Sequence, residues 1–383
     1  MKLIHKIKKR NLNIEKKYRK IANWKIARDR EAFYDTHDFH PYFAAYPPIL
    51  VHKIFKKFGR NSKTILDPFM GGGSTIIEGV RHGYISLGID ISEFSKSITQ
   101  AKAQPFKISN EIFNSNIKKI KNIIRRFRGN QINTKKIKTP LVTNVQKWFS
   151  KKSLYELTLI LQIISRINEK NHILFFKVCL SSILRKCSNA KNAQQHLNIQ
   201  KMKKIPDTLD IFMKKILLMK SQMNNYYNYI KSKNINIKFK LYACDVRNIT
   251  KIIKPNSVDM VVTSPPYGVG SRYTDIYRLH FEFFGLEKPK LKSSLEKNKN
   301  FSEKLKDGLM QIYKVMKKNS YFICVYGDPS TVDGITVKVI NDCKKIGFKY
   351  KGLISCPIEK KFSKHHTIYK RFIPKDFILI FKK

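Results

Sequence analysis

The chain has 383 residues, of which 42% are hydrophobic, and this is enough for one large domain or two modest domains with a buried core. It has no run of roughly 18 apolar residues and no apolar signal-peptide core in its basic N-terminal region, so we expect neither a membrane protein nor an exported one. The formal charge of +50, from 77 Lys and Arg against 27 Asp and Glu, favours nucleic acid as a polyanionic partner, although Lys, Ile and Asn are abundant throughout and part of the excess is compositional.

The cysteines and histidines do not predict a metal site. The six cysteines are scattered without a Cys-x-x-Cys pair, which indicates reduced, mostly buried thiols in a cytoplasmic protein. The pair His365-His366 has no nearby cysteine or acid to complete a cluster, so we interpret it as a surface pair and expect no metal. The cysteines are Cys179, Cys187, Cys244, Cys324, Cys343 and Cys356.

The predicted elements begin with residues 1–36, which we interpret as a basic helical arm. Trp24 and Phe33 are its expected anchors, and the arm is expected to fold over the core or over a nucleic acid. A regular alternation of strands and helices follows the arm. Its first members are a strand over 64–67, a helix over about 75–82, a strand over 84–90 and a helix over about 93–103.

A glycine-rich loop follows the first predicted strand. Asp67-Pro68-Phe69 leads into Gly71-Gly72-Gly73, where the missing Cβ atoms let a ligand approach the backbone. The N-terminus of the next helix favours a negative group such as a carboxylate. The loop has neither the Gly-Lys-Ser/Thr of a Walker loop nor G-x-G-x-x-G spacing. Asp90, at the end of the second strand, can accept hydrogen bonds from ribose hydroxyls.

The alternation stops over residues 106–236, which carry helical patterns and few strand signals. Polar donors close one of these helices, where Arg185 suits guanine and Asn189 or Gln194 suits adenine. In the competing interpretation, Arg185 and Lys186 are cations at a helix C-terminus that offset the helix dipole. The predicted helices of this segment cover 154–167, 173–184 and 207–230.

The alternation resumes beyond this segment and contains a second motif. The apolar strand Val258–Val262 ends in Thr263-Ser264-Pro265-Pro266-Tyr267. The prolines remove two backbone donors and leave nearby carbonyls as free acceptors, which suits holding a planar amino group while an aromatic ring stacks on it. Taken alone, the peptide is equally typical of a Pro-rich turn. The other predicted elements are strands over 237–244 and 321–326, helices near 249, over 301–317 and over 333–346, and a closing hairpin of 350–358 and 376–381 at the sheet edge.

This pattern predicts an α/β fold, a Rossmann-like doubly wound sheet with a helical insertion and a C-terminal antiparallel hairpin. Ligands of such sheets bind at the carboxyl ends of the strands. Asp67, Asp90, Asp245 and Ser264 all follow predicted strands, so we expect them to converge on one edge. The predicted divisions are the arm 1–36, an α/β domain formed by 37–105 and 237–383, and the insertion 106–236.

Together, the two motifs resemble those of the S-adenosylmethionine-dependent DNA amino-methyltransferases. That family has a first motif similar to Asp67-Pro68-Phe69-x-Gly-x-Gly and a catalytic motif Asp/Asn/Ser-Pro-Pro-Tyr/Phe, and the form with Ser264 is most similar to the cytosine-N4 branch. The segment 40–50 resembles the one that precedes the first motif, and 244–247 resembles an acidic turn near the adenine of the cofactor. Ser74 is a departure, because the family usually has Gly-Thr directly after the loop glycine.

The resemblance covers roughly residues 38–105 and 236–383 and implies that this domain binds S-adenosylmethionine and methylates a flipped base in double-stranded DNA. The Ser264 hydroxyl and the Pro265 carbonyl would accept the two N–H bonds of the amino group, and Tyr267 would stack on the base. The implied catalytic residues are Ser264, Pro265, Pro266 and Tyr267. The implied cofactor-binding residues are Asp67, Pro68, Phe69, Gly71, Gly72, Gly73, Asp90, Ser92, Asp245 and Thr263.

The helical insertion is the expected target-recognition region. Its candidate DNA contacts are Arg185, Lys186 and Asn189, and Arg272 is a further candidate for a phosphate beside the flipped base. For Gly270-Ser271-Arg272-Tyr273 a plain solvated loop is the competing interpretation.

The leading hypothesis is a site-specific cytosine-N4 DNA methyltransferase whose partner is a restriction endonuclease acting on the same site. An adenine-N6 enzyme comes second. RNA guanine-N2 methyltransferases have a similar Asp-Pro-Phe loop, but they carry Asp-Pro-Pro-Tyr where this chain has Ser264. A non-enzymatic basic DNA-binding protein would leave Asp67, Asp90 and Ser264 without a common purpose.

Overall fold

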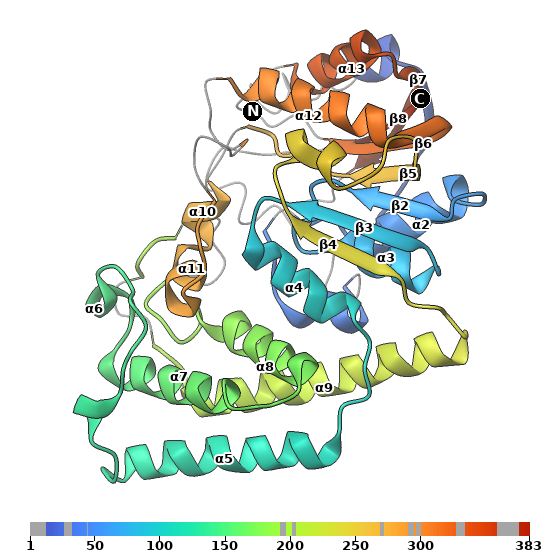
Figure 1. Ribbon diagram of the computed structural model, residues 1–383. Coiled ribbons are helices and arrows are strands. Elements are labelled where there is room, and N and C mark those ends of the chain that lie inside the picture. The colour runs from blue at the N-terminus through green and yellow to red at the C-terminus, as the bar shows by residue number, and fades with distance from the viewer. Residues whose placement is uncertain are drawn as a thin grey trace.

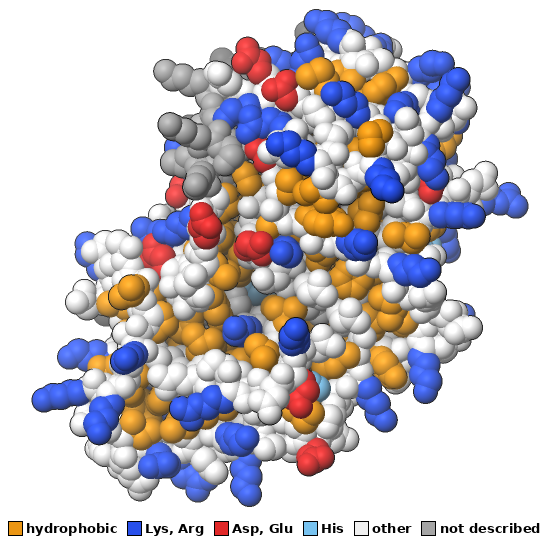
Figure 2. All heavy atoms as spheres, viewed as in Figure 1, with side chains coloured by type: hydrophobic (Ala, Val, Ile, Leu, Met, Phe, Trp, Pro, Cys, Tyr) orange, Lys and Arg blue, Asp and Glu red, His pale blue; other side chains and the backbone are white. Residues whose placement is uncertain are grey.

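A computed structural model shows one large twisted sheet with helices on its faces and a layer of helices below it (Figure 1). Figure 2 shows Lys and Arg side chains spread over this view, with few acidic ones between them. The structure describes residues 13–26, 33–43, 45–191, 197–200, 204–268, 272–289, 295, 300–326, 334–357 and 375–383.

The sheet has eight strands in the order β1-β7-β8-β6-β5-β2-β3-β4. β8 is antiparallel to both of its neighbours, and the other neighbouring pairs are parallel. The chain starts the central part of the sheet at β2, moves outward through β3 and β4, and returns to the other side of β2 with β5. The strands are β1 Lys20–Asn23, β2 Thr64–Asp67, β3 Ile85–Asp90, β4 Phe239–Ala243, β5 Val258–Thr263, β6 Met316–Tyr326, β7 Lys349–Pro357 and β8 Lys375–Lys382.

The central strands are buried on both faces, because their successive apolar side chains point into different cores. In β2, Ile65 packs with α2 on one face, whereas Leu66 packs with η4, α12 and α13 on the other. Met260 and Val261 of β5 divide in the same way. The elements around the sheet are η2 Asp35–Phe39, α2 Pro48–Phe58, α3 Ser74–Arg81, α4 Glu93–Ala103, η4 Val246–Lys251, α10 Tyr273–Ile276, α11 Arg278–Phe284, α12 Phe301–Val315 and α13 Ile335–Ile346.

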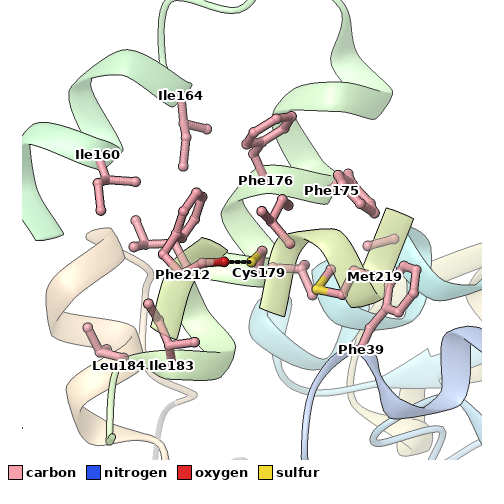
Figure 3. Packing of buried hydrophobic residues seen from close by; sticks show 14 of the residues in the cluster. Phe39, Ile160, Ile164, Phe175, Phe176, Cys179, Ile183, Leu184, Phe212 and Met219 are labelled. Carbon is pink, nitrogen blue, oxygen red and sulfur yellow. Dashed lines mark hydrogen bonds between the residues drawn. The ribbon is translucent and has the colours of Figure 1, made fainter. Parts of the chain in front are cut away.

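The segment between α4 and β4 forms the helical layer. Figure 3 shows Ile160, Phe176 and Phe212 converging from α7, α8 and α9, with Phe39 of η2 against the same core. This core is continuous with the apolar face of α3, so the layer is packed against the sheet domain. Its elements are α5 Asn110–Arg128, η3 Thr134–Lys136, α6 Val145–Trp148, α7 Lys151–Ile164, α8 Lys170–Ile183 and α9 Thr208–Ser232.

Two details of the sequence prediction are wrong. Within the arm, a short helical stretch over 13–17 is followed by the strand β1, which pairs in parallel with β7. The hairpin of β7 and β8 therefore lies inside the sheet, and β1 forms the edge. The position of β1 depends on pairing with a strand that lies far away in the sequence. Its four residues have mixed exposure, so they carry no strand pattern that would reveal this pairing. His365-His366 and Gln194 lie outside the described residues.

Candidate functional site

A cavity that opens to solvent, with about 1010 Å³ of empty space when the solvent at its mouth is included, lies at the carboxyl ends of β2, β3 and β5. This is the point where the strand order reverses, which is where doubly wound sheets bind their ligands. Nine of the residues predicted from the sequence line it: Pro68, Phe69, Gly71, Gly72, Asp90, Ser92, Asp245, Ser264 and Pro266.

Asp67 and Thr263 lie beneath the cavity and do not line it. Both are buried, and the Thr263 hydroxyl donates a 2.6 Å hydrogen bond to Asp67 Oδ1. Tyr46 donates to the other carboxylate oxygen at 3.2 Å, and burial raises the pKa of Asp67. Asp67 therefore ties the end of β2 to the end of β5 from beneath the cavity.

The glycine loop is held closely by a tyrosine ring. Gly71 and Gly73 have φ angles of 46° and 86°, which disfavour any residue with a Cβ. A Cβ on Gly71 or Gly72 would lie 2.9 or 2.7 Å from Tyr42, and one on Gly73 would lie 2.7 Å from Thr99. The sequence prediction assigned this closeness to a ligand, but in the structure protein side chains fill that space, and Gly73 does not line the cavity.

Asp90 holds the loop by its backbone. Gly71 N donates to Asp90 Oδ2 and Ser92 N donates to Oδ1, both at 2.9 Å. Burial raises the pKa of Asp90 to about 6, against the lowering effect of these two hydrogen bonds. Each oxygen has a further lone pair, so the carboxylate can accept hydroxyl donors from the cavity.

Asp245 is the second acidic residue of the cavity wall, after Asp90. It caps η4 by accepting a 2.9 Å hydrogen bond from Arg247 N, and its Oδ2 lies 2.6 Å from Arg247 Nη2. The bidentate pairing fixes the carboxylate where the chain leaves β4.

The Ser-Pro-Pro-Tyr peptide divides between the cavity and the core. Ser264 and Pro266 line the cavity, whereas Pro265 and Tyr267 are not among the lining residues. The Tyr267 ring packs edge to face on Tyr326, with centroids 4.7 Å apart, and Tyr326 donates a 2.9 Å hydrogen bond to the Pro266 carbonyl. Burial raises the pKa of Tyr267, and a hydrogen bond with the Ser264 side chain opposes that rise. The Tyr267 ring, which the sequence analysis expected to stack on a base, therefore packs on another ring of the protein.

Aromatic residues that the sequence analysis did not single out make much of the cavity wall. Tyr42 stacks against Tyr273 and Tyr277, at centroid distances of 6.0 and 5.1 Å and interplanar angles of 18° and 25°. Its hydroxyl bonds with Ser95 at 2.9 Å. The signal in the sequence is a group of tyrosines on each side of the two motifs, at 42 and 46 and at 273 and 277.

The predicted DNA contacts are not equally available. Arg185 is buried, and its Nη2 donates to the Lys191 carbonyl at 2.9 Å, so its guanidinium is engaged in holding the chain after α8. Asn189 donates to the Lys147 carbonyl at 3.0 Å. Lys186 is exposed, and Arg272 precedes α10 beside the cavity.

Comparisons with known proteins agree with the motifs. Residues 4–102 match the sequence model of a family described as DNA methylase. The Type II methyltransferase M.MvaI of Kocuria varians is 28% identical over 250 residues, which are 61% of this chain and 53% of the relative. The Type II methyltransferase M.BsoBI of Geobacillus stearothermophilus is 24% identical over 77% of this chain and 64% of the relative.

The N-terminal part of the chain is therefore similar to the N4/N6 DNA methylase family. The chain spans between about half and two thirds of the length of these two curated relatives. Among solved structures, the putative DNA modification methylase TTHA0409 of Thermus thermophilus, complexed with S-adenosyl-L-methionine, has a TM-score of 0.24 and 18% identity over 36% of this chain and 53% of that one. The putative RNA methyltransferase PH1948 of Pyrococcus horikoshii has a TM-score of 0.36 and 8% identity over 99% and 98%.

Among the residues that the structure describes, no helix combines the length and the apolar character needed to cross a membrane.

Proposed function

We propose that this chain transfers a methyl group from S-adenosylmethionine to the exocyclic amino group of a base in double-stranded DNA. The observation that carries the proposal is the single cavity that brings Gly71, Asp90, Asp245 and Ser264 together from motifs far apart in the sequence. Similarity to the DNA methylase family and to a Type II methyltransferase supports the same reaction.

The cofactor half of the cavity is proposed to lie between the glycine loop and the ends of β3 and β4. Asp90 would accept hydrogen bonds from ribose hydroxyls while its backbone contacts keep the loop in place. Asp245 and the apolar wall residue Phe69 would bound the adenine. S-adenosylmethionine supplies an electrophilic methyl group on a sulfonium sulfur, which needs no metal.

The base half is proposed to lie at Ser264 and Pro266. An exocyclic amine is a weak nucleophile because its lone pair is delocalised into the ring. The Ser264 hydroxyl and the Pro265 carbonyl would accept the two N–H bonds and direct the lone pair at the methyl carbon. The N–CH₃ bond forms as the S–CH₃ bond breaks, and the amine then loses one proton to solvent.

For Tyr267 to stack on the base, its ring would have to leave Tyr326 when DNA binds. The aromatic stack of Tyr42, Tyr273 and Tyr277 is the alternative platform, because all three rings line the cavity already. Replacing Tyr267 and Tyr273 separately by Leu distinguishes the two platforms. Only the substitution in the ring that stacks on the base should lower the affinity for DNA with an unpaired target base.

Cytosine N4 is the proposed target atom, on the strength of Ser264 in place of an acid, and adenine N6 is the alternative. The helical layer is proposed to recognise the sequence around the target, and a restriction endonuclease of the same specificity is the proposed partner. The division into an arm at 1–36, a catalytic domain at 37–105 and 237–383 and an insertion at 106–236 belongs to this proposal.

The test is methyl transfer from labelled S-adenosylmethionine to double-stranded DNA, followed by identification of the methylated nucleoside. We expect N4-methylcytosine, and a fall of about 100-fold in rate for Ser264→Ala with nearly unchanged cofactor affinity. Ser165→Ala is the matched control, because that hydroxyl is exposed at the end of α7 and bonds to the Gln162 carbonyl. Transfer by Ser264→Ala at the parental rate would reduce Ser264 to a turn residue.

A further inference from the structure

Away from the cavity, α2 and α3 bring two imidazoles and a carboxylate together. His52 lies on α2, and Glu78 and His82 lie one turn apart on α3, so that both face the same side of the helix. One ligand atom from each residue lies within 4.8 Å of the others.

The spacing of these three atoms is that of a metal-binding triangle. His52 Nδ1 and His82 Nε2 are 3.0 Å apart, and Glu78 Oε2 lies 3.7 Å from the first and 4.0 Å from the second. A point equidistant from the three atoms is about 2.1 Å from each, which is the length of zinc–nitrogen and zinc–oxygen bonds.

The carboxylate is aimed at that point by its own partners. Glu78 is completely buried, and its Oε1 accepts a 2.7 Å hydrogen bond from the Tyr34 hydroxyl and lies 3.1 Å from His37 Nε2. Its Oε2 has no hydrogen-bond partner among the residues that the structure describes. A buried carboxylate oxygen without a partner is costly, and a cation between it and the two imidazoles would satisfy it.

We propose that His52, Glu78 and His82 form a binding site for a divalent transition metal, for which Zn²⁺ is the best fit. Imidazole ligands favour zinc and its neighbours over magnesium and calcium. The side chains of His52 and His82 are 32% and 21% exposed, so a water molecule can complete the coordination. Tyr34 and His37 supply the outer shell of hydrogen bonds that orients the carboxylate.

The metal would join α2 to α3, and α3 begins at Ser74, directly after the glycine loop. Its role is therefore structural, as a link that holds the C-terminal end of α3 against α2. The competing arrangement uses the same atoms without an ion, with one neutral imidazole donating its N–H to the other across 3.0 Å.

The test uses the untagged full chain, freed of metal with a chelator and titrated with Zn²⁺ and with Co²⁺. We expect one equivalent to bind, visible ligand-field absorption from bound Co²⁺, and a rise of about 3 °C in melting temperature at saturating Zn²⁺. His52→Gln and His82→Gln should each weaken binding by at least about 100-fold, and Tyr34→Phe by about 10-fold.

The control is the double variant His365→Gln and His366→Gln, which removes the other candidate chelating pair and should bind the metal as the parent does. Stoichiometric binding that is lost in this control but kept in His52→Gln would overturn the proposal. So would a parent chain that binds neither ion with a Kd below roughly 10 μM. Because metal binding is measured without DNA or S-adenosylmethionine, the result is independent of the proposed methyl transfer.

Discussion

The cavity wall and the helical layer are stabilised in different ways. In the cavity wall and directly beneath it, buried polar groups hold one another: Asp90 holds the backbone of the glycine loop, and Asp67 below it bonds to Thr263. In the helical layer, a large apolar core joins α5, α7, α8 and α9, and the polar groups lie mainly outside. A position at the cavity thus requires a particular side chain. Most positions in the helical layer require only that the side chain be apolar or that it be polar.

The sharpest test of this difference is Gly71→Val, which we expect to abolish cofactor binding. Its φ of 46° already disfavours a Cβ, and that Cβ would lie 2.9 Å from the Tyr42 ring. Gly83→Val is the matched control, since Gly83 also has a positive φ of 76° but a Cβ at that position would have no neighbour within 4 Å among the described residues. Calorimetric titration with S-adenosylmethionine should show binding to the control. Equal loss in both variants would mean that backbone strain, and not the space at the wall, decides the effect.

Acidification should weaken the same site gradually. Burial raises the pKa of Asp90 to about 6, so we expect cofactor affinity to be constant above that pH and to fall about tenfold for each pH unit below it. The effect on the free protein has the opposite sign. Since folding raises this pKa from 3.8, the contribution of Asp90 to stability decreases as the pH rises from about 4 to 6.

Asp90→Ala provides the control for the pH profile. This substitution should weaken the binding of S-adenosylmethionine by about 1–3 kcal/mol at neutral pH, because the charged acceptor is removed. Its affinity should then show no inflection near pH 6. A profile that still bends there would assign the titration to another group.

In the helical layer, the expected effect of a single polar change is on stability and not on binding. Arg128 Nε donates to Glu156 Oε1 and Nη2 to Asp207 Oδ2, both at 2.7 Å, which joins α5 to α7 and to the start of α9. Arg128→Ala should lower the free energy of unfolding by about 1–3 kcal/mol, because it leaves the buried Glu156 unpaired. Chemical denaturation measures this, with Arg125→Ala on the same helix as the control. A change in cofactor affinity would show that the two regions are coupled.

The smallest expected effect concerns the exposed cations. Replacing Lys118 and Lys119 of α5 by Gln should weaken binding to all DNA sequences alike. The slope of the logarithm of the binding constant against the logarithm of the salt concentration should become shallower by about 0.9 for each phosphate that the variant no longer neutralises. Lys56 and Lys57, another consecutive exposed pair at the end of α2, are the control. If the α2 pair has the same effect, the general basic surface carries the affinity and the helical layer has no special part in it.

The same difference explains what the sequence predicted. The β–α alternation and the apolar helices of the layer were confirmed, because periodicity is a local property of the chain. Asp90, Asp245 and Ser264 could be placed at one edge, because strand ends in a parallel sheet meet there.

What the sequence did not predict depends on contacts between distant segments. The Tyr42 ring over the glycine loop, the burial of Arg185 and the edge position of β1 are all tertiary pairings. The cluster at His52 is of the same kind, because α2 and α3 must pack before its atoms meet.

The pairing of β1 with β7 has a consequence for biosynthesis. Residues 20–23 are made long before their partners Leu353 to Ser355, which lie roughly 330 residues later in the chain. At 5–20 residues per second, about 20 s to a minute separates the two events. During that interval β1 has no partner strand in the sheet. The sheet can close its edge only after the hairpin of β7 and β8 has emerged.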